Sequence, residues 1–286
     1  MNEIGPSTNN VFLFTFVRMN PPTPGHLLVI DSMINEALRL NVNKIFILLS
    51  STMDEKNPMP CGKENDDPSL MDAAFKSTIL KEMVSAYKQK MINDSFNEED
   101  KMKIASMELI VLCAKGNTFG FIGKIIQQFY IDNGIQKVKC IFFVGEDRAD
   151  FATQIVNYFE SKDFIEKPVD TKILSREGME ELIKEGPGET AISEIPLSQF
   201  SASFVRKLVK DEKYQEFYEV YKDYLDESEI QKLFTTILDG LNNPKKSSKT
   251  KTKRGGKQKR KTKKDGNRNK LKKPKTKKGR KQKRKS

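Results

Sequence analysis

Short apolar runs alternate along the chain with longer segments in which apolar residues recur at helical spacing. The runs are rich in β-branched and aromatic residues, which predicts strands buried on both faces of a parallel sheet. We expect strands at residues 11–17, 44–50, 107–113, 138–144 and 171–174. We expect helices at residues 25–40, 70–91, 119–131, 211–224 and 227–241, one more that opens at Ser201, and an acidic connection through Asp100. The pattern predicts an α/β fold, a Rossmann-like parallel sheet of about five strands with helices on both faces and C-terminal helices after it.

Residues 11–30 hold the densest candidate chemistry. The first strand cannot continue through Pro21, Pro22 and Pro24, because proline lacks the backbone N–H that a strand pairs. Apolar residues fall at helical spacing from residue 27 on, so His26, the one histidine of the chain, lies in the first turn of a helix. Unpaired N–H groups and the positive end of the helix dipole favour phosphate at such a place. The alternative is a histidine that is only hydrogen-bonded into the fold.

The turn between this strand and helix resembles a known signature. Residues 18–26 read Arg-Met-Asn-Pro-Pro-Thr-Pro-Gly-His, which resembles the (H/T)-x-G-H motif of the nucleotidylyltransferase superfamily, often preceded there by G-R-F-x-P. Thr23, Gly25 and His26 take the motif positions, and Arg18 and Pro21 match the upstream part. Val17 stands where the family often has glycine.

A second stretch supports the resemblance. Residues 200–206, Phe-Ser-Ala-Ser-Phe-Val-Arg, are similar to the family motif I-S-x-(T/S)-x-x-R, which places Ser201, Ser203 and Arg206 in its conserved positions. The alternative for Ser201 is a plain helix N-cap with a solvated arginine nearby. After the fourth strand, Gly145 and Asp147 resemble the family segment G-x-D, although a turn and a helix cap would use the same residues.

The resemblance implies transfer of a nucleotidyl group from a nucleoside triphosphate to a phosphorylated small molecule, with release of pyrophosphate. His26 and Thr23 would then donate to the α-phosphate. Ser201, Ser203 and Arg206 would bind the β- and γ-phosphates, and Arg18 would place a further positive charge near the phosphates. Mg²⁺ is expected on the triphosphate, with few protein ligands of its own. ATP is the favoured donor, and nicotinamide mononucleotide is the first acceptor to consider.

Several alternatives stay open. Within the superfamily these are a CTP-dependent cytidylyltransferase and a phosphopantetheine or flavin adenylyltransferase. An aminoacyl-tRNA synthetase would need a K-M-S-K-S-like loop, which the sequence lacks. From another class, an inactive nucleotide-fold protein would bind nucleic acid through its basic tail. The polar segment 51–68 is either a substrate lid or an ordinary exposed loop.

Charge is divided very unevenly. The formal net charge is +12, but residues 245–286 carry 24 of the 51 basic residues and one of the 39 acidic ones, which leaves a net charge of −11 on the rest. We therefore expect a flexible N-terminal arm (1–10), an α/β domain with its C-terminal helices (11–241) and a disordered Lys/Arg-rich tail (242–286). Such a tail is typical of sequence-independent nucleic-acid binding and of nuclear or nucleolar import, and the alternative is a solubilising tail.

Three cysteines, Cys61, Cys113 and Cys140, have no metal-ligand spacing and are odd in number. We interpret them as reduced thiols of an intracellular protein, cytoplasmic or nuclear. The N-terminal residues have no pattern of a signal peptide, and no apolar run approaches the length of a membrane span. We therefore expect no membrane partner, and the oligomeric state stays open.

Overall fold

The computed structural model describes residues 10–54, 56–62, 73–174 and 195–244. The chain divides into two units, residues 1–247 and 248–286, and every described residue belongs to the first. Residues 1–9 of the expected N-terminal arm, most of the connection before Ile195 and residues 245–286 of the expected tail lie outside the described residues. Asn242, which begins the expected tail, is instead the last residue of a helix.

Five parallel strands form one sheet in the order β3-β2-β1-β4-β5. They are β1 (Val11–Val17), β2 (Lys44–Leu49), β3 (Glu108–Cys113), β4 (Lys139–Gly145) and β5 (Asp170–Leu174). The central strand β1 pairs with β2 and β4, so that Phe14 lies opposite Phe46 on one side and Phe142 on the other. The chain builds the sheet outward from β1 to β3 and then returns to the other side of β1 to add β4. The predicted fold class is confirmed.

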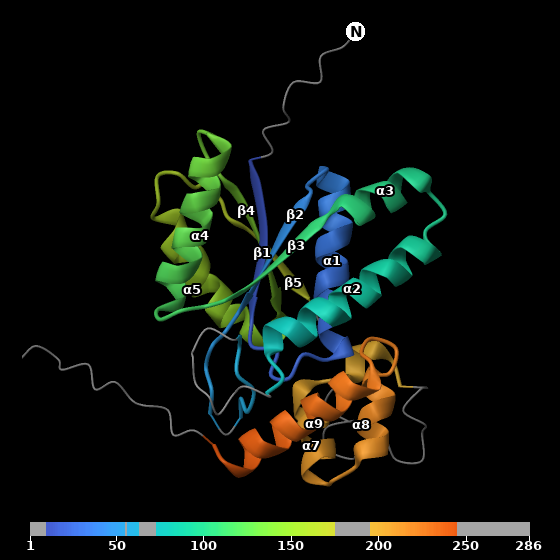
Figure 1. Ribbon diagram of the computed structural model, residues 1–286. Coiled ribbons are helices and arrows are strands. Elements are labelled where there is room, and N and C mark those ends of the chain that lie inside the picture. The colour runs from blue at the N-terminus through green and yellow to red at the C-terminus, as the bar shows by residue number, and fades with distance from the viewer. Residues whose placement is uncertain (1–9, 55, 63–72, 175–194, 245–286) are drawn as a thin grey trace, which may run out of the picture. The chain divides into compact units, whose positions relative to one another are not determined.

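Helices cover both faces of the sheet (Figure 1). Helices α1 (Pro24–Leu40), α2 (Lys76–Asp94) and α3 (Glu98–Ser106) lie on one side, and α4 (Thr118–Asn133) and α5 (Ala149–Glu160) lie on the other. Side chains alternate along β1, so Leu13 enters the core under α1, whereas Phe12, Phe14 and Phe16 enter the core under α4 and α5. The inner strands β2, β1 and β4 are buried from both sides, as expected for a parallel sheet, whereas the edge strands β3 and β5 are only partly buried.

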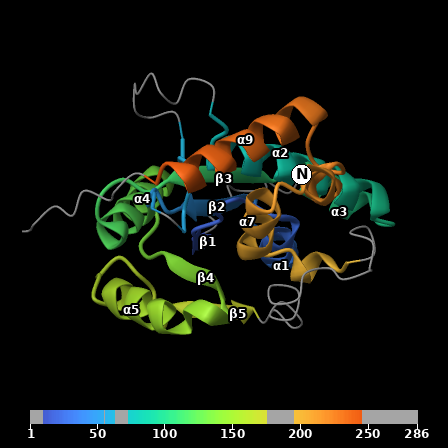
Figure 2. The same ribbon diagram turned by 90° about the horizontal axis from the view of Figure 1, so that it is seen from below.

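Three further helices lie beyond the carboxyl ends of the strands (Figures 1 and 2). These are α7 (Ala202–Lys210), α8 (Tyr214–Tyr221) and α9 (Glu227–Asn242), and they contact one another. Tyr221 is fully buried, and its hydroxyl donates to the carbonyl oxygen of Pro22 over 2.7 Å. The C-terminal helices are therefore joined to the turn after β1, where the first motif lies.

Some predicted helix boundaries are wrong. Helix α2 begins at Lys76 rather than at residue 70, because Phe75 is extended and Ala74 donates its N–H to the Thr236 side chain over 2.8 Å. Helix α8 covers 214–221 rather than 211–224, because Asp211 ends α7 and Glu212 has a positive φ of 56°. A tertiary contact therefore delays the start of α2, whereas the local backbone conformation after α7 delays the start of α8.

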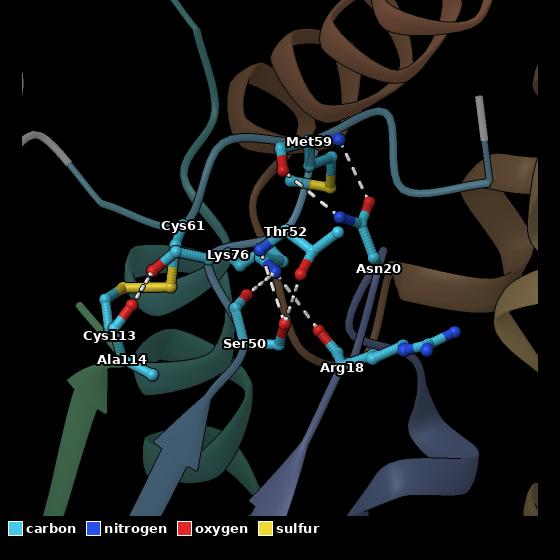
Figure 3. Close-up of a disulfide and its surroundings, with 10 residues drawn as sticks. Arg18, Asn20, Ser50, Thr52, Met59, Cys61, Lys76, Cys113 and Ala114 are labelled. Carbon is cyan, nitrogen blue, oxygen red and sulfur yellow. Dashed lines mark hydrogen bonds between the residues drawn. A yellow bond between two sulfur atoms is a disulfide. The ribbon is translucent and has the colours of Figure 1, made fainter. Parts of the chain in front are cut away.

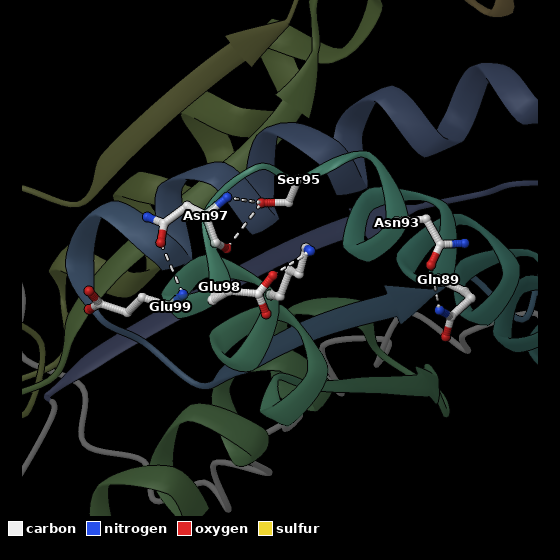
Figure 4. A network of polar contacts seen from close by, with 7 residues as sticks. Gln89, Asn93, Ser95, Asn97, Glu98 and Glu99 are labelled. Atoms are coloured by element: carbon white, nitrogen blue, oxygen red, sulfur yellow. Dashed lines mark hydrogen bonds and ion pairs between the residues drawn. The ribbon is translucent and has the colours of Figure 1, made fainter.

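Helices α3 and α5 were not predicted. The expected connection through Asp100 is wrong for its last residues, since α3 opens at Glu98 with Asn97 as its N-cap. The Asn97 side chain accepts from the N–H of Glu99 over 3.0 Å, and the Ser95 hydroxyl donates to the carbonyl of Asn97 over 3.4 Å in the turn that follows α2 (Figure 4). An N-cap residue followed by three acidic residues, here Glu98, Glu99 and Asp100, is typical of the start of a helix, so α3 could have been predicted from the sequence.

Two of the three cysteines are joined. Cys61 and Cys113 form a disulfide, which contradicts the expectation of reduced thiols, whereas Cys140 is free and buried. Cys113 ends β3 and pairs in register with Leu49, the last residue of β2, and Cys61 lies in the segment that follows β2. Both cysteines therefore reach the same edge of the sheet. Burial raises the pKa of the Cys140 thiol, which keeps it protonated.

Among the helices of the described residues, none is both long and apolar enough to cross a membrane.

Candidate functional site

The turn after β1 is held in place by buried side chains. Asn20 is 2% exposed, and its side chain bonds the backbone of Met59 in both directions, donating to the carbonyl over 3.1 Å and accepting from the N–H over 2.9 Å. Thr23 has extended backbone and is the N-cap of α1, and Pro24 occupies the first helical position. The strand therefore leads into the helix through a turn that is tied to the segment after β2.

Local contacts fix the proton position on His26. The backbone N–H of Thr23 donates to Nδ1 of His26 over 2.9 Å. An amide N–H can only donate, so Nδ1 is the acceptor and the neutral ring carries its proton on Nε2. The hydroxyl of Thr23 lies 2.9 Å from the same nitrogen and donates to the carbonyl of Phe200 over 2.6 Å. The first motif thus presents an imidazole N–H donor, oriented by Thr23.

Gly25 lets the two motif segments meet. A Cβ at Gly25 would lie 2.5 Å from the carbonyl oxygen of Phe200 and 3.0 Å from that of Leu197. The first turn of α1 therefore packs directly on the backbone of residues 197–200, and only glycine fits there. This contact and the Thr23 hydrogen bond join segments that lie far apart in the sequence, since Thr23 and Phe200 are 177 residues apart.

The start of α7 brings the second motif to the same place. Ser201 is the N-cap of α7, and its hydroxyl accepts the N–H of Phe204 over 3.1 Å, which still allows the hydroxyl to donate. Arg206 donates to the backbone carbonyl of Asn20 over 2.6 Å and to the Ser203 hydroxyl over 3.0 Å. Burial lowers the pKa of Arg206 from its usual value, and the charge of Asp54 opposes this shift. The guanidinium stays charged, because its ordinary pKa is far above neutral.

A cavity of about 250 Å³ lies between these segments, which we call the cationic cavity. Its basic lining side chains are Arg18, Lys56, Arg148 and Arg206, with His26 beside them. The described residues that line it include no Asp or Glu. Residues from the ends of β1 and β4 form its base, where the strand order changes direction and α/β sheets bind ligands. The arrangement suits a ligand with several negative charges.

The structure brings together most of the predicted site residues. Arg18, His26, Gly145, Ser201, Ser203 and Arg206 line the cationic cavity. Thr23 and Gly25 do not line it, and they lie buried behind His26, so the expected contact of Thr23 with a phosphate is replaced by a contact that orients the histidine. Asp147 lies in the short 3-10 turn Glu146–Arg148 after β4, and its side chain lies outside the described part of the chain.

No protein-family model matches this chain, and no curated protein matches it.

Lys76 was missed by the sequence analysis. It is 1% exposed, and its ammonium donates to the carbonyl of Arg18 over 3.2 Å and to that of Ser50 (Figure 3). Burial, with a smaller contribution from the charge of Arg18, lowers the pKa of Lys76 from 10.5 to about 8. Lys76 therefore holds together the chain ends that leave β1 and β2, close to the cationic cavity.

A second cavity of about 730 Å³ lies between α9 and a group of residues after β2, and we call it the α9 cavity. The residues on that side are Met53, Asp54, Asn57, Pro58 and Pro60. One stripe of α9 lines it with polar side chains, among them Gln231, Thr235 and Asp239. Asn57 lines both cavities, and its side chain donates to Asp54 over 2.7 Å, which fixes the turn between them. The described part of the predicted loop 51–68 thus separates the two cavities.

Within the described residues, no group of three or more His, Cys, Asp or Glu side chains could hold a metal ion. A Mg²⁺ ion that arrives on a triphosphate would be coordinated by phosphate oxygens and water.

Proposed function

We propose that this protein transfers a nucleotidyl group from a nucleoside triphosphate, with ATP favoured, to a phosphorylated small molecule and releases pyrophosphate. The supporting observation is the cationic cavity, where both motif segments, four basic side chains and the Nε2–H of His26 meet at the switch point of the sheet. The proposal includes membership of the nucleotidylyltransferase superfamily.

The reaction is an in-line attack on the α-phosphorus by a phosphate oxygen of the acceptor. Charge grows on the non-bridging oxygens and on the leaving pyrophosphate, so catalysis depends on positioning and on fixed donors. His26 would donate from Nε2 to an α-phosphate oxygen. Arg206, Ser203 and Ser201 would bind the leaving phosphates at the start of α7, where the helix dipole adds positive potential.

In this proposal the acceptor would bind in the α9 cavity, next to the cationic cavity. A cavity of about 250 Å³ is too small for a triphosphate and an acceptor together, since ligand sites usually measure roughly 300–1,000 Å³. Lys56 lines the cationic cavity, and the next residue, Asn57, also lines the α9 cavity. The acceptor phosphate would meet Lys56, and its hydroxylated or amide-bearing body would lie along the polar stripe of α9.

The deciding experiment is a panel of donor and acceptor pairs. Purified protein is incubated with Mg²⁺, with ATP or CTP, and with nicotinamide mononucleotide, phosphopantetheine, flavin mononucleotide or glycerol 3-phosphate. Pyrophosphate release is measured and the product is identified by mass. We expect one pair to give turnover that depends on His26. Release with none of the pairs, or equal release by His26→Ala, would contradict the proposal.

The basic tail supports a second, separate candidate. Residues 245–286 carry a net charge of +23, which would neutralise several phosphates of DNA or RNA without reading sequence. The same clusters would serve as nuclear or nucleolar import signals. A truncation that ends at Pro244 should lose nucleic-acid affinity at low salt and keep nucleotidyl transfer. Equal binding by the full chain and the truncated chain would refute this role.

A further inference from the structure

The disulfide lies beside the candidate site but takes no part in the proposed reaction. It joins Cys61, in the segment after β2, to Cys113 at the end of β3, with a sequence separation of 52 (Figure 3). Cys61 is 6% exposed, whereas Cys113 is half-buried. Cys113 is thus the more exposed residue of the pair, and we take its sulfur as the point where an external reductant attacks.

A short chain of contacts leads from Cys61 to the cationic cavity. Two residues before Cys61, the backbone of Met59 bonds the side chain of Asn20 through both its N–H and its carbonyl (Figure 3). The carbonyl of Asn20 accepts a hydrogen bond from Arg206 over 2.6 Å. Asn20 and Met59 are both almost fully buried. The position of Arg206 thus depends on the turn at Asn20, and the position of Asn20 depends on the segment that Cys61 holds.

Hydrogen bonds also hold this segment at the start of α2. The N–H of Lys76 donates to the carbonyl of Pro60 over 3.0 Å, and the N–H of Ser77 donates to that of Cys61 over 2.9 Å. Each such bond contributes little net free energy against water. The disulfide is the one covalent constraint that the described residues place on this segment. Its loss would enlarge the range of conformations that residues 57–62 visit while the fold remains.

We propose that the Cys61–Cys113 disulfide is a redox switch of the proposed nucleotide site, in which reduction weakens triphosphate binding through Met59, Asn20 and Arg206. The inference rests on the proposed function, because it concerns the regulation of that site. Oxidised protein is the tight-binding form. Reduced protein binds the triphosphate less tightly, because the carbonyl of Asn20 is then more mobile and positions Arg206 less well.

The chemical step is thiol–disulfide exchange with a dithiol reductant. A thiolate of the reductant attacks Sγ of Cys113, the S–S bond breaks, and Cys61 leaves as a thiolate that takes up a proton. The second thiol of the reductant then displaces Cys113 from the mixed disulfide. In total two electrons and two protons pass to the protein, and the reductant leaves as its own disulfide.

The test compares ATP binding in the two redox states. The full chain is prepared oxidised, one half is treated with dithiothreitol and desalted, and the Kd for ATP with Mg²⁺ is measured by calorimetry. A thiol assay should find two more thiols after treatment. We expect ATP to bind at least about five-fold more weakly after reduction, the lower end of ordinary coupling between sites. Cys113→Ser should bind ATP as weakly as the reduced protein does, and dithiothreitol should not change its Kd. Cys140→Ala should show the full change in Kd on reduction.

A double-mutant cycle tests the path of the effect. Asn20→Ala removes the link to Met59, so reduction should change the Kd of this variant by less than about two-fold. Circular dichroism checks that each form is folded, and Asn20→Ser replaces Asn20→Ala if the latter does not fold. A disulfide that only stabilises the fold would shift Tm and leave the Kd equal in both states, and this result would overturn the switch alone. Oxidised protein that binds no ATP would overturn both the switch and the proposed function.

Discussion

The segments that follow β1 and β2 lie side by side, but only the first carries a sequence motif. The first, residues 18–26, carries a recognisable motif and places His26 at the cavity through contacts within the turn. The second, residues 50–62, carries no motif, yet it supplies Lys56 and holds Asn20 through Met59. In the proposed reaction the first segment would supply the hydrogen-bond donor of His26, and the second would position the residues around that donor. Substitutions in the first should therefore lower kcat, and substitutions in the second should mainly raise KM.

The largest effect is expected from His26→Ala. Removing one donor that acts on transition-state charge should lower kcat by roughly 10²–10³-fold and change the KM for ATP little. Steady-state kinetics with the best pair of substrates measures this. Arg39→Ala is the control on the same helix, since Arg39 lies in the last turn and pairs with Glu36. Turnover of His26→Ala at the parent rate would mean that the donor has no role in the chemistry.

Gly25→Ala should come next. Its Cβ would lie 2.5 Å from the carbonyl oxygen of Phe200, so the first motif would move away from the second. We expect a loss of about 1–3 kcal/mol in the free energy of unfolding and a fall in kcat of roughly 10-fold or more. Gly120→Ala is the matched control, because a Cβ at that position would have no atom within 4 Å. Chemical denaturation and kinetics of both variants make the comparison, and equal behaviour of the two would refute the packing argument.

Gly240→Ala tests the second segment in the same way. A Cβ here would lie 2.3 Å from the carbonyl oxygen of Pro58, so α9 would push Pro58 away and change the α9 cavity, which Pro58 lines. We expect the KM for the acceptor to rise roughly ten-fold while kcat stays within about three-fold. A fall in kcat with an unchanged acceptor KM would mean that the two segments do not divide their roles as proposed.

The last prediction concerns stability alone and not turnover, because burial of the Lys76 ammonium makes the free energy of unfolding depend on pH. Its pKa is about 8 in the folded protein and near 10.5 when unfolded, so between these pH values the unfolded chain binds more protons. Stability therefore rises with pH across this window, by up to about 3 kcal/mol from this group. Denaturation of the parent protein and of Lys76→Met at pH values from about 7 to 10.5 isolates this contribution as the difference between them. A difference that stays constant with pH would contradict a buried, charged Lys76.

The features that were predicted correctly from the sequence depend on residues that are close together along the chain. Continuous apolar runs such as residues 11–17 predict buried strands, and helix starts such as Ser201 follow from neighbours within four residues. Lys56, Lys76 and the disulfide were missed because their roles come from distant parts of the chain. Asn20 and Met59 are 39 residues apart, and Asn20 and Arg206 are 186 apart. A bond from a side chain to a distant carbonyl leaves no periodic pattern in a single sequence, so it cannot be predicted without the fold.

The hydrogen bond from Tyr221 to Pro22 has a consequence for how the protein is made. The two residues are 199 positions apart, and ribosomes add roughly 5–20 residues per second. The turn that bears the first motif is therefore synthesised roughly 10–40 s before the tyrosine that covers it. Until then the carbonyl of Pro22 must bond to water. The start of α1 also cannot yet pack against the backbone of residues 197–200, because these residues are not yet made. A nascent chain can form the sheet early, but the candidate site is complete only near the end of translation.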